Sequence, residues 1–134
     1  MSTTFPYQLK ETPFGRVVDP TINLPVSTWY GWRSFKFIVD SGADVSLVPR
    51  SIADLVGIDL AEANRLRSFG IEGSGVDVLQ GNLTVKIGAC ELELPCLFSS
   101  REDSPTLLGR AGLFDHFSIV FDNQKRKIVF KPIK

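Results

Sequence analysis

The sequence predicts one domain that is mainly β. Its 134 residues are enough for a single hydrophobic core and too few for two. Apolar and polar side chains alternate over residues 83–96 and again over residues 117–131, and each segment is interrupted once by residues that favour a turn. Helical patterns, by contrast, are confined to two stretches of a few residues each.

The first part of the chain differs from the rest. Residues 1–25 contain four of the eight prolines and show little periodicity, which predicts an extended N-terminal arm or leader. A folded domain is expected over residues 26–134. Near its beginning, residues 35–39 and 45–48 are mostly apolar and are expected to form two strands.

Short helices are expected at two places. Ser51 could cap a helix that Gly57 ends, and residues 110–117 suit another turn of helix. The two alternating segments predict hairpins, the first of which turns at residues 88–89. Pro95 lacks a backbone N–H, so we expect it to place the second strand of that hairpin at a sheet edge or to end it.

Charge and hydropathy narrow the expected partners. Fifteen Lys and Arg residues balance fifteen Asp and Glu residues, so no net field recruits nucleic acid or an anionic membrane. No stretch approaches the roughly 18 apolar residues of a membrane span, and the first residues lack the pattern of a secretion signal. We therefore expect a soluble, cytoplasmic protein that binds neither nucleic acid nor membrane.

The cysteines and the histidine offer little chemistry. Cys90 and Cys96 lie in an apolar strand and are expected to be reduced core residues, with a disulfide as the alternative. With His116 the only histidine, the chain makes a poor ligand set for a metal, and its aspartates do not resemble a calcium loop. A nucleophile activated by histidine would have to use His116, which is expected at the surface or at a helix end. We expect no metal and no cofactor.

One stretch, FIVDSGADVSLVP at residues 37–49, places a carboxylate between two apolar strand segments. An ionised carboxylate at the end of a buried apolar run is costly unless it is paired, hydrogen-bonded or kept partly protonated by its neighbours, so something must compensate Asp40. Alone, Asp-Ser-Gly is most simply a tight turn. Two further motifs accompany it: a glycine-rich tip at residues 68–76, between segments that could pair, and two aliphatic residues before a glycine at residues 106–110.

Together these three motifs resemble the retropepsin-like aspartic proteases, the family of the retroviral proteases and their cellular relatives. The motifs stand in the order of that family, and the resemblance runs from about residue 35 to residue 130. It implies an all-β, single-lobe, closed β-barrel-like acid-protease fold with one or two short helices and a flap hairpin. The long N-terminal segment and the full C-terminal hairpin look closer to the cellular relatives than to the retroviral enzymes.

The resemblance implies roles for the residues of the first motif. Asp40 matches the catalytic aspartate, and Ser41, Gly42 and Ala43 complete the active-site loop. Ser41 takes the place whose hydroxyl hydrogen-bonds across a dimer interface. Gly42 takes the place where the backbone lies close to the substrate.

The other two motifs are expected to support and cover this loop. Leu107 is expected to line the substrate pocket, and Asp44 and Arg110 match a structural ion pair of the retroviral members. The expected flap and substrate-binding residues are Phe69, Gly70, Ile71, Glu72, Gly73, Ser74, Gly75 and Val76.

An aspartic protease needs two neighbouring carboxylates that share a proton. This chain has one Asp-Ser-Gly and is too short for two lobes, so a twofold homodimer would supply the second Asp40. We therefore expect an aspartic endopeptidase that hydrolyses extended peptides or proteins through a shared water. The alternative is a catalytically silent module of the same fold that dimerises or binds peptides, which the intact Asp40, Ser41 and Gly42 disfavour.

Overall fold

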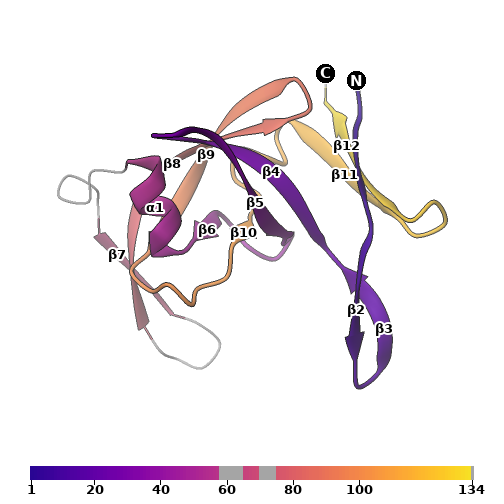
Figure 1. Ribbon diagram of the computed structural model, residues 1–134, viewed down its shortest axis with the longest axis horizontal. Helices are drawn as coiled ribbons and strands as arrows, with labels where there is room; N and C mark the ends of the chain where they lie inside the picture. The colour runs from indigo at the N-terminus through magenta and orange to yellow at the C-terminus, as the bar shows by residue number, and fades with distance from the viewer. Residues whose placement is uncertain (58–64, 70–74, 134) are drawn as a thin grey trace.

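The computed structural model describes residues 1–57, 65–69 and 75–133 (Figure 1). Its elements, in chain order, are β1 (Thr3–Pro6), β2 (Gln8–Thr12), β3 (Gly15–Asp19), β4 (Thr21–Thr28), β5 (Gly31–Val39), β6 (Ser46–Val48), α1 (Arg50–Val56), β7 (Arg65–Phe69), β8 (Gly75–Ile87), β9 (Cys90–Ser99), β10 (Leu107–Leu108), β11 (Phe117–Asp122) and β12 (Lys127–Pro132). Within the described ranges, no helix is long and apolar enough to cross a membrane.

Most strands belong to one sheet, of order β4-β5-β10-β6-β9-β8-β7. A further pairing joins β4 to β8 at Val26 and Val85. The six strands β4, β5, β10, β6, β9 and β8 therefore form a ring, and β7 lies outside it. These strands supply most of the large buried side chains, among them Leu24, Phe37 and Phe98. The all-β, single-lobe class predicted from the sequence is confirmed, and the closed barrel expected there corresponds to this ring, which one residue pair closes.

β8 and β9 form the long hairpin that the alternation predicts, and it turns at residues 88–89. The expectation that Pro95 would end its strand or place it at an edge is wrong, because β9 continues to Ser99 between β8 and β6. Pairing between β9 and β6 begins only at Cys96. Pro95, which has no N–H to donate, therefore lies where β9 has a neighbour on one side alone.

α1 ends where the sequence predicts and begins with a different cap. Gly57 adopts a left-handed conformation, with φ of 77°, and ends the helix. Pro49 occupies the N-cap position, while the N–H and the hydroxyl of Ser51 donate to the carboxylate of Glu102 at 2.9 and 2.7 Å. The prediction of a second helix over residues 110–117 is wrong: residues 110–116 form a series of hydrogen-bonded turns, and β11 begins at Phe117.

A second sheet, of order β1-β12-β11, holds both ends of the chain. The pairing of β11 with β12 confirms the predicted C-terminal hairpin, and β1 pairs with the other side of β12. The ring of Phe5 packs edge-on against Phe130, with 5.3 Å between the ring centroids. The two termini therefore lie side by side, at the top of Figure 1.

Residues 1–25 lie largely in strands. β1 belongs to the terminal sheet, and β2 and β3 form a separate two-stranded sheet. β4 runs across the boundary expected at residue 25. Ile22 and Leu24 are fully buried among the core side chains, so the hydrophobic core begins before residue 26.

The turns from β2 to β3 and from β4 to β5 are built in the same way, at residues 12–15 and 28–31. In each, a threonine hydroxyl donates to a glycine carbonyl, at 2.7 and 2.6 Å, and accepts the N–H of the third turn residue at 3.1 Å. Both glycines have positive φ, 103° and 88°, which a side chain rarely allows. The third residues, Phe14 and Tyr30, are 96% and 70% exposed.

Candidate active site

Asp40 directly follows β5 and is half-buried. Its N–H donates to the carbonyl of Leu108 at 3.0 Å, and its carbonyl accepts the N–H of Ala43 at 3.2 Å. The carboxylate oxygen Oδ1 accepts the N–H of Gly42 at 2.9 Å, which compensates part of the cost of burying the charge. Such a bond also forms in a purely structural turn, so the chemistry of this site depends on what surrounds Asp40.

β10 lies between the strands on either side of the Asp40 loop, parallel to β5 and antiparallel to β6. β5, which ends immediately before Asp40, is thus hydrogen-bonded along both edges, to β4 on one side and to β10 on the other. Leu108 is fully buried and fixes β10 in the core. Leu107, expected to line a substrate pocket, is half-buried.

Gly109 follows β10 and approaches the backbone of the loop closely. A Cβ built on Gly109 would lie 2.5 Å from the carbonyl oxygen of Val45 and still closer to its carbonyl carbon. The Gly109 N–H donates to the hydroxyl of Ser46, which is fully buried, at 3.0 Å. Only a residue without a side chain fits here, and the contact fixes the end of the loop.

Arg110 binds the outer side of the same loop. Its guanidinium donates to the carbonyl of Ser41 at 2.5 Å and forms an ion pair with Asp44, while its backbone N–H donates to the carbonyl of Ala43 at 3.0 Å. The ion pair is exposed to solvent and contributes little to stability by itself. The three contacts of Arg110 together hold residues 41–44 in one conformation.

The remaining loop residues face outward. Ser41 and Gly42 are exposed, and Ala43 is half-buried. A Cβ on Gly42 would lie 3.2 Å from Oδ1 of Asp40, closer than an ordinary van der Waals contact. Glycine at this position therefore leaves the carboxylate accessible from the exposed side of the loop.

β7 and β8 form the hairpin expected around the glycine-rich tip. They pair from Arg65 with Leu79 to Phe69 with Gly75, and β7 is the outermost strand of the sheet. The expected flap residues between these strands, Gly70, Ile71, Glu72, Gly73 and Ser74, lie outside the described residues.

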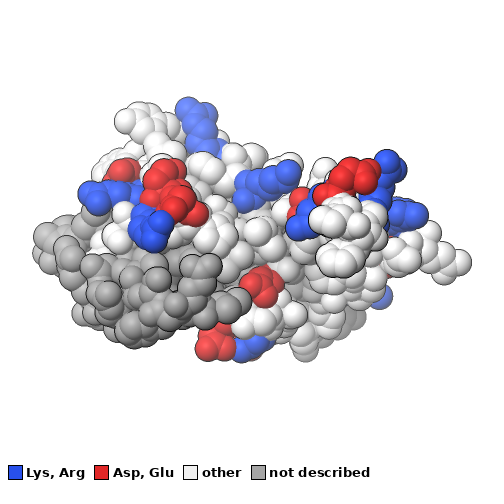
Figure 2. All heavy atoms as spheres, turned by 90° about the horizontal axis from the view of Figure 1, so that it is seen from below, with Lys and Arg blue, Asp and Glu red and all other residues white. Residues whose placement is uncertain are grey.

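The electrostatic surroundings are mixed. Figure 2 shows Lys and Arg side chains interspersed with Asp and Glu on the described part of the face that it views. No group of three His, Cys, Asp or Glu side chains that could hold a metal ion occurs among the residues that the structure describes. The arrangement around Asp40 suits proton transfer by a carboxylate.

Two residues that position the loop were not identified from the sequence. Ser46 lies within the apolar stretch of residues 45–48, where a hydroxyl that must be buried could have indicated a hydrogen bond. Pro20 accepts the N–H of Val39 through its carbonyl, at 2.7 Å. A backbone acceptor of this kind leaves no signal in the sequence.

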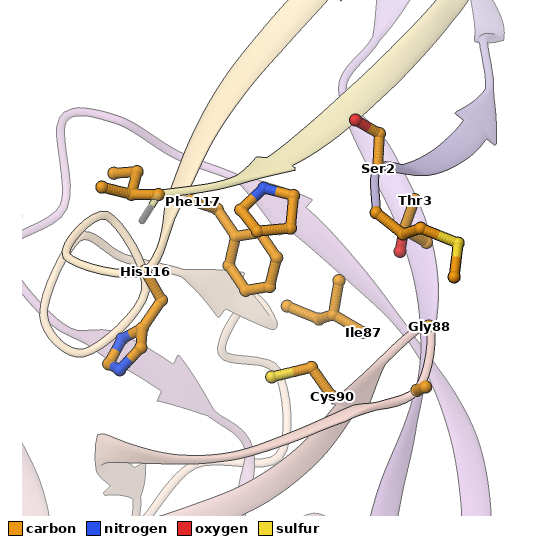
Figure 3. A pocket seen from close by; sticks show the side chains of 11 residues that line it. Ser2, Thr3, Ile87, Gly88, Cys90, His116 and Phe117 are labelled. Carbon is orange, nitrogen blue, oxygen red and sulfur yellow. The ribbon is translucent and has the colours of Figure 1, made fainter.

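A pocket of about 560 Å³ lies beside the chain ends, and no residue of the Asp40 loop lines it (Figure 3). It is lined by Met1, Ser2, Thr3, Ile87, Gly88, Ala89, Cys90, His116, Phe117, Pro132 and Ile133. Cys90 and His116 thus border the same hollow, but Nδ1 of His116 is 2.9 Å from the carbonyl of Gly112, which fixes the ring at the surface. The loop residue Ser41 does not line this pocket.

The two cysteines are both free thiols, but they differ in burial. Cys96 is fully buried, as expected, whereas Cys90 is exposed, which corrects its assignment to the core. Burial raises the pKa of the Cys96 thiol to about 12. The exposed thiol alone is therefore available to solution reagents.

We expect a thiol reagent such as Ellman's reagent to modify one cysteine of the folded chain at pH 8 and both cysteines in denaturant, because the thiolate is the reactive form. A Cys90→Ser variant should show no rapid reaction when folded. Rapid modification of two thiols in the folded chain would contradict the burial of Cys96.

The buried thiol of Cys96 makes the free energy of unfolding depend on pH. Above the ordinary pKa of 9.0, the unfolded chain loses a proton that the folded chain keeps, so the free energy of unfolding falls as pH rises from about 9 towards 12. Urea unfolding at pH 8 and pH 10 should show a smaller fall in a Cys96→Ala variant than in the wild type. An equal fall in the free energy of unfolding of both chains would mean that groups other than Cys96 cause the pH dependence.

Comparisons with known proteins bear on the fold. No protein-family model matches the sequence, and no curated protein matches it. The structure is similar to a retropepsin-like aspartic protease from Rickettsia conorii, with a TM-score of 0.66 and 19% identity over 97% of this chain and 89% of that one. It is also similar to EIAV protease complexed with the inhibitor HBY-793, with a TM-score of 0.54 and 19% identity over 72% of this chain and 86% of that one. The fold that the three motifs predict is confirmed.

Proposed function

We propose that this chain, which has the fold of the retropepsin-like aspartic proteases, is an aspartic endopeptidase that acts as a homodimer. One observation carries the proposal: a half-buried aspartate on a loop that its own backbone, β10 and Arg110 hold in place, with the exposed side of the loop open. The Asp-Ser-Gly motif occurs once in the sequence, and peptide hydrolysis by aspartates needs two carboxylates. A second copy of the chain supplies the other.

In the proposed dimer, the two Asp40 side chains meet at the twofold axis. An isologous contact places the same residue of each subunit beside its equivalent, so the exposed side of each loop faces the partner. Two carboxylates this close retain one proton between them, because a second negative charge is unfavourable. The Ser41 hydroxyl, exposed in the single chain, would hydrogen-bond across the interface.

Hydrolysis follows from this shared proton. The ionised carboxylate takes a proton from a water held between the two, and the water oxygen attacks the scissile carbonyl carbon. The protonated carboxylate donates to the carbonyl oxygen and stabilises the tetrahedral species. The C–N bond then breaks as the nitrogen receives a proton, which leaves a carboxyl and an amine product and one proton on the pair.

The β7–β8 hairpin is proposed as the flap over the substrate. An extended peptide would pair with main-chain groups, and its alternate side chains would enter apolar pockets bordered by residues such as Leu107. Phe69, Gly75 and Val76 stand at the described base of this hairpin. Substrates are therefore expected to be unfolded or extended segments with apolar side chains next to the cut bond.

Subunit mixing tests whether two Asp40 residues act together. A peptide library first identifies a substrate; wild-type chain at fixed concentration is then pre-incubated with increasing amounts of an Asp40→Asn chain. Because each mixed dimer has one carboxylate, a tenfold excess of the variant should reduce cleavage roughly tenfold through the statistics of pairing.

The matched control is a tenfold excess of an Asp54→Asn chain, since Asp54 is exposed on α1. This variant keeps Asp40, so cleavage should increase with the added chain. Cleavage that the Asp40→Asn chain leaves unchanged would mean that a single subunit is active, which contradicts the homodimer proposal.

A further inference from the structure

The β2–β3 hairpin is not covered by the described part of its own chain. β2 and β3 pair only with each other, and Figure 1 shows them extending below the rest of the molecule. Three apolar side chains on the hairpin, Leu9, Phe14 and Val17, are 44%, 96% and 38% exposed. Leu9 pairs with Val18 and Val17 with Lys10, so Leu9 and Val17 lie on opposite faces of the hairpin, and Phe14 lies at its tip. Exposed apolar groups on both faces of a projecting element are typical of an interaction surface.

The hairpin has few contacts of its own to stabilise it. An isolated two-stranded hairpin is marginally stable in water. The ion pair between Arg16 and Glu11, at 2.8 Å, is largely exposed, and the threonine bonds at the turn order only residues 12–15. Packing against another surface would supply the burial that this hairpin lacks.

The base of the hairpin lies beside the Asp40 loop. β3 ends at Asp19, and the carbonyl of the next residue, Pro20, accepts the N–H of Val39. Val39 immediately precedes Asp40. The other leg is held at Tyr7, whose N–H donates to the carbonyl of Arg126 at 3.1 Å. The hairpin is thus fixed at its base, and along its length it pairs with no other strand that the structure describes.

This position determines what the hairpin can reach. Five residues per strand extend roughly 17 Å from the base. In the proposed dimer, the twofold axis passes beside Asp40, so an element that begins next to Asp40 and projects from its own subunit can reach the partner. Figure 2 is viewed from below Figure 1, the side towards which the hairpin projects.

We propose that the β2–β3 hairpin is a dimerisation arm that inserts into a second copy of this chain, which would contact Phe14 at the tip and Leu9 and Val17 on the two opposite faces of the arm. The inference rests on the proposed homodimer and adds a surface that each subunit contributes to it. By symmetry, each subunit donates one arm and receives one. The arm would stabilise the pairing of the two Asp40 loops without contacting the reacting atoms.

The test compares two exposed aromatic residues in identical turns. Phe14→Ser removes the tip of the arm, and the matched control, Tyr30→Ser, changes the equivalent residue of the β4–β5 turn. Because Phe14 is almost fully exposed, its replacement should leave the fold unchanged by circular dichroism. Sedimentation equilibrium gives the dimer dissociation constant, and cleavage is measured at several chain concentrations.

We expect Phe14→Ser to raise the dimer dissociation constant tenfold or more, in the range of an interface hot spot, and to reduce cleavage at low concentration, with recovery at high concentration. Tyr30→Ser should change neither. A photoreactive benzoylphenylalanine at position 14 should cross-link two copies of the chain.

The outcomes separate the two proposals. A wild-type chain that dimerises and cleaves through Asp40, with an unchanged dissociation constant in Phe14→Ser, would overturn the arm and leave the protease standing. Weaker cleavage at every concentration with normal dimerisation would assign the hairpin to substrate binding and also overturn the arm. A wild-type chain that stays monomeric would overturn both.

Discussion

Replacing Asp40 with asparagine is expected to lower peptide cleavage by about a thousandfold or more, because an amide cannot accept the proton of the attacking water. The fold should survive. The asparagine Oδ1 can still accept the N–H of Gly42, which is the bond that orients the carboxylate in the wild type. Dimerisation should survive for the same reason.

The measurement is product formation from a peptide library, read by mass spectrometry at equal concentrations of wild type and variant. Asp54→Asn is the control, since it removes a surface carboxylate from α1 and should cleave normally. Equal products from wild type and Asp40→Asn would end the protease proposal. Dimerisation of a wild type that cleaves nothing would instead support the catalytically silent module.

Replacing Gly109 with alanine is expected to destabilise the chain by about 3 kcal/mol or more and to lower the melting temperature by roughly 10 °C. The added methyl would overlap the carbonyl group of Val45, which is backbone and cannot move aside as a side chain can. β10 would have to separate from the Asp40 loop. Cleavage should fall with stability, because the same contact positions the loop.

Ser46→Ala separates the two parts of this contact. It removes the hydroxyl that accepts the Gly109 N–H and introduces no clash, so its expected cost is that of one unsatisfied buried donor, about 1–3 kcal/mol. Urea unfolding of both variants measures the difference. A Gly109→Ala chain as stable as the wild type would contradict the close approach of β10 to the loop.

Much of the fold could be predicted from local patterns. The β8–β9 and β11–β12 hairpins follow from alternation and turn residues, because each strand pairs with its neighbour in sequence. That the carboxylate of Asp40 needs compensation was also expected, but pairing, hydrogen bonding and partial protonation were left open, and the Gly42 N–H was not predicted as the donor. The ion pair of Asp44 with Arg110 came from the resemblance, because its members are far apart in sequence.

What the sequence did not reveal depends on distant pairing. β1 is placed by β12, at the other end of the chain, and no pattern in residues 3–6 identifies that partner. The β2–β3 hairpin had a local signal, the Thr-Pro-Phe-Gly of residues 12–15, but its strands alternate weakly because neither face packs on the core. The prediction that Pro95 marks a sheet edge or a strand end was wrong for a related reason. β6, the second neighbour of β9, begins to pair with it only at Cys96, one residue after Pro95.

The pairing of β1 with β12 also affects how the molecule can be handled. Both ends leave the same sheet, beside the pocket of Figure 3, whereas β2 and β3 project from the opposite side of Figure 1. A fluorophore, a purification tag or a surface tether attached to either end would therefore leave the side from which β2 and β3 project unobstructed. Joining the two ends with a short linker should likewise be tolerated, which makes the chain a candidate for circular permutation.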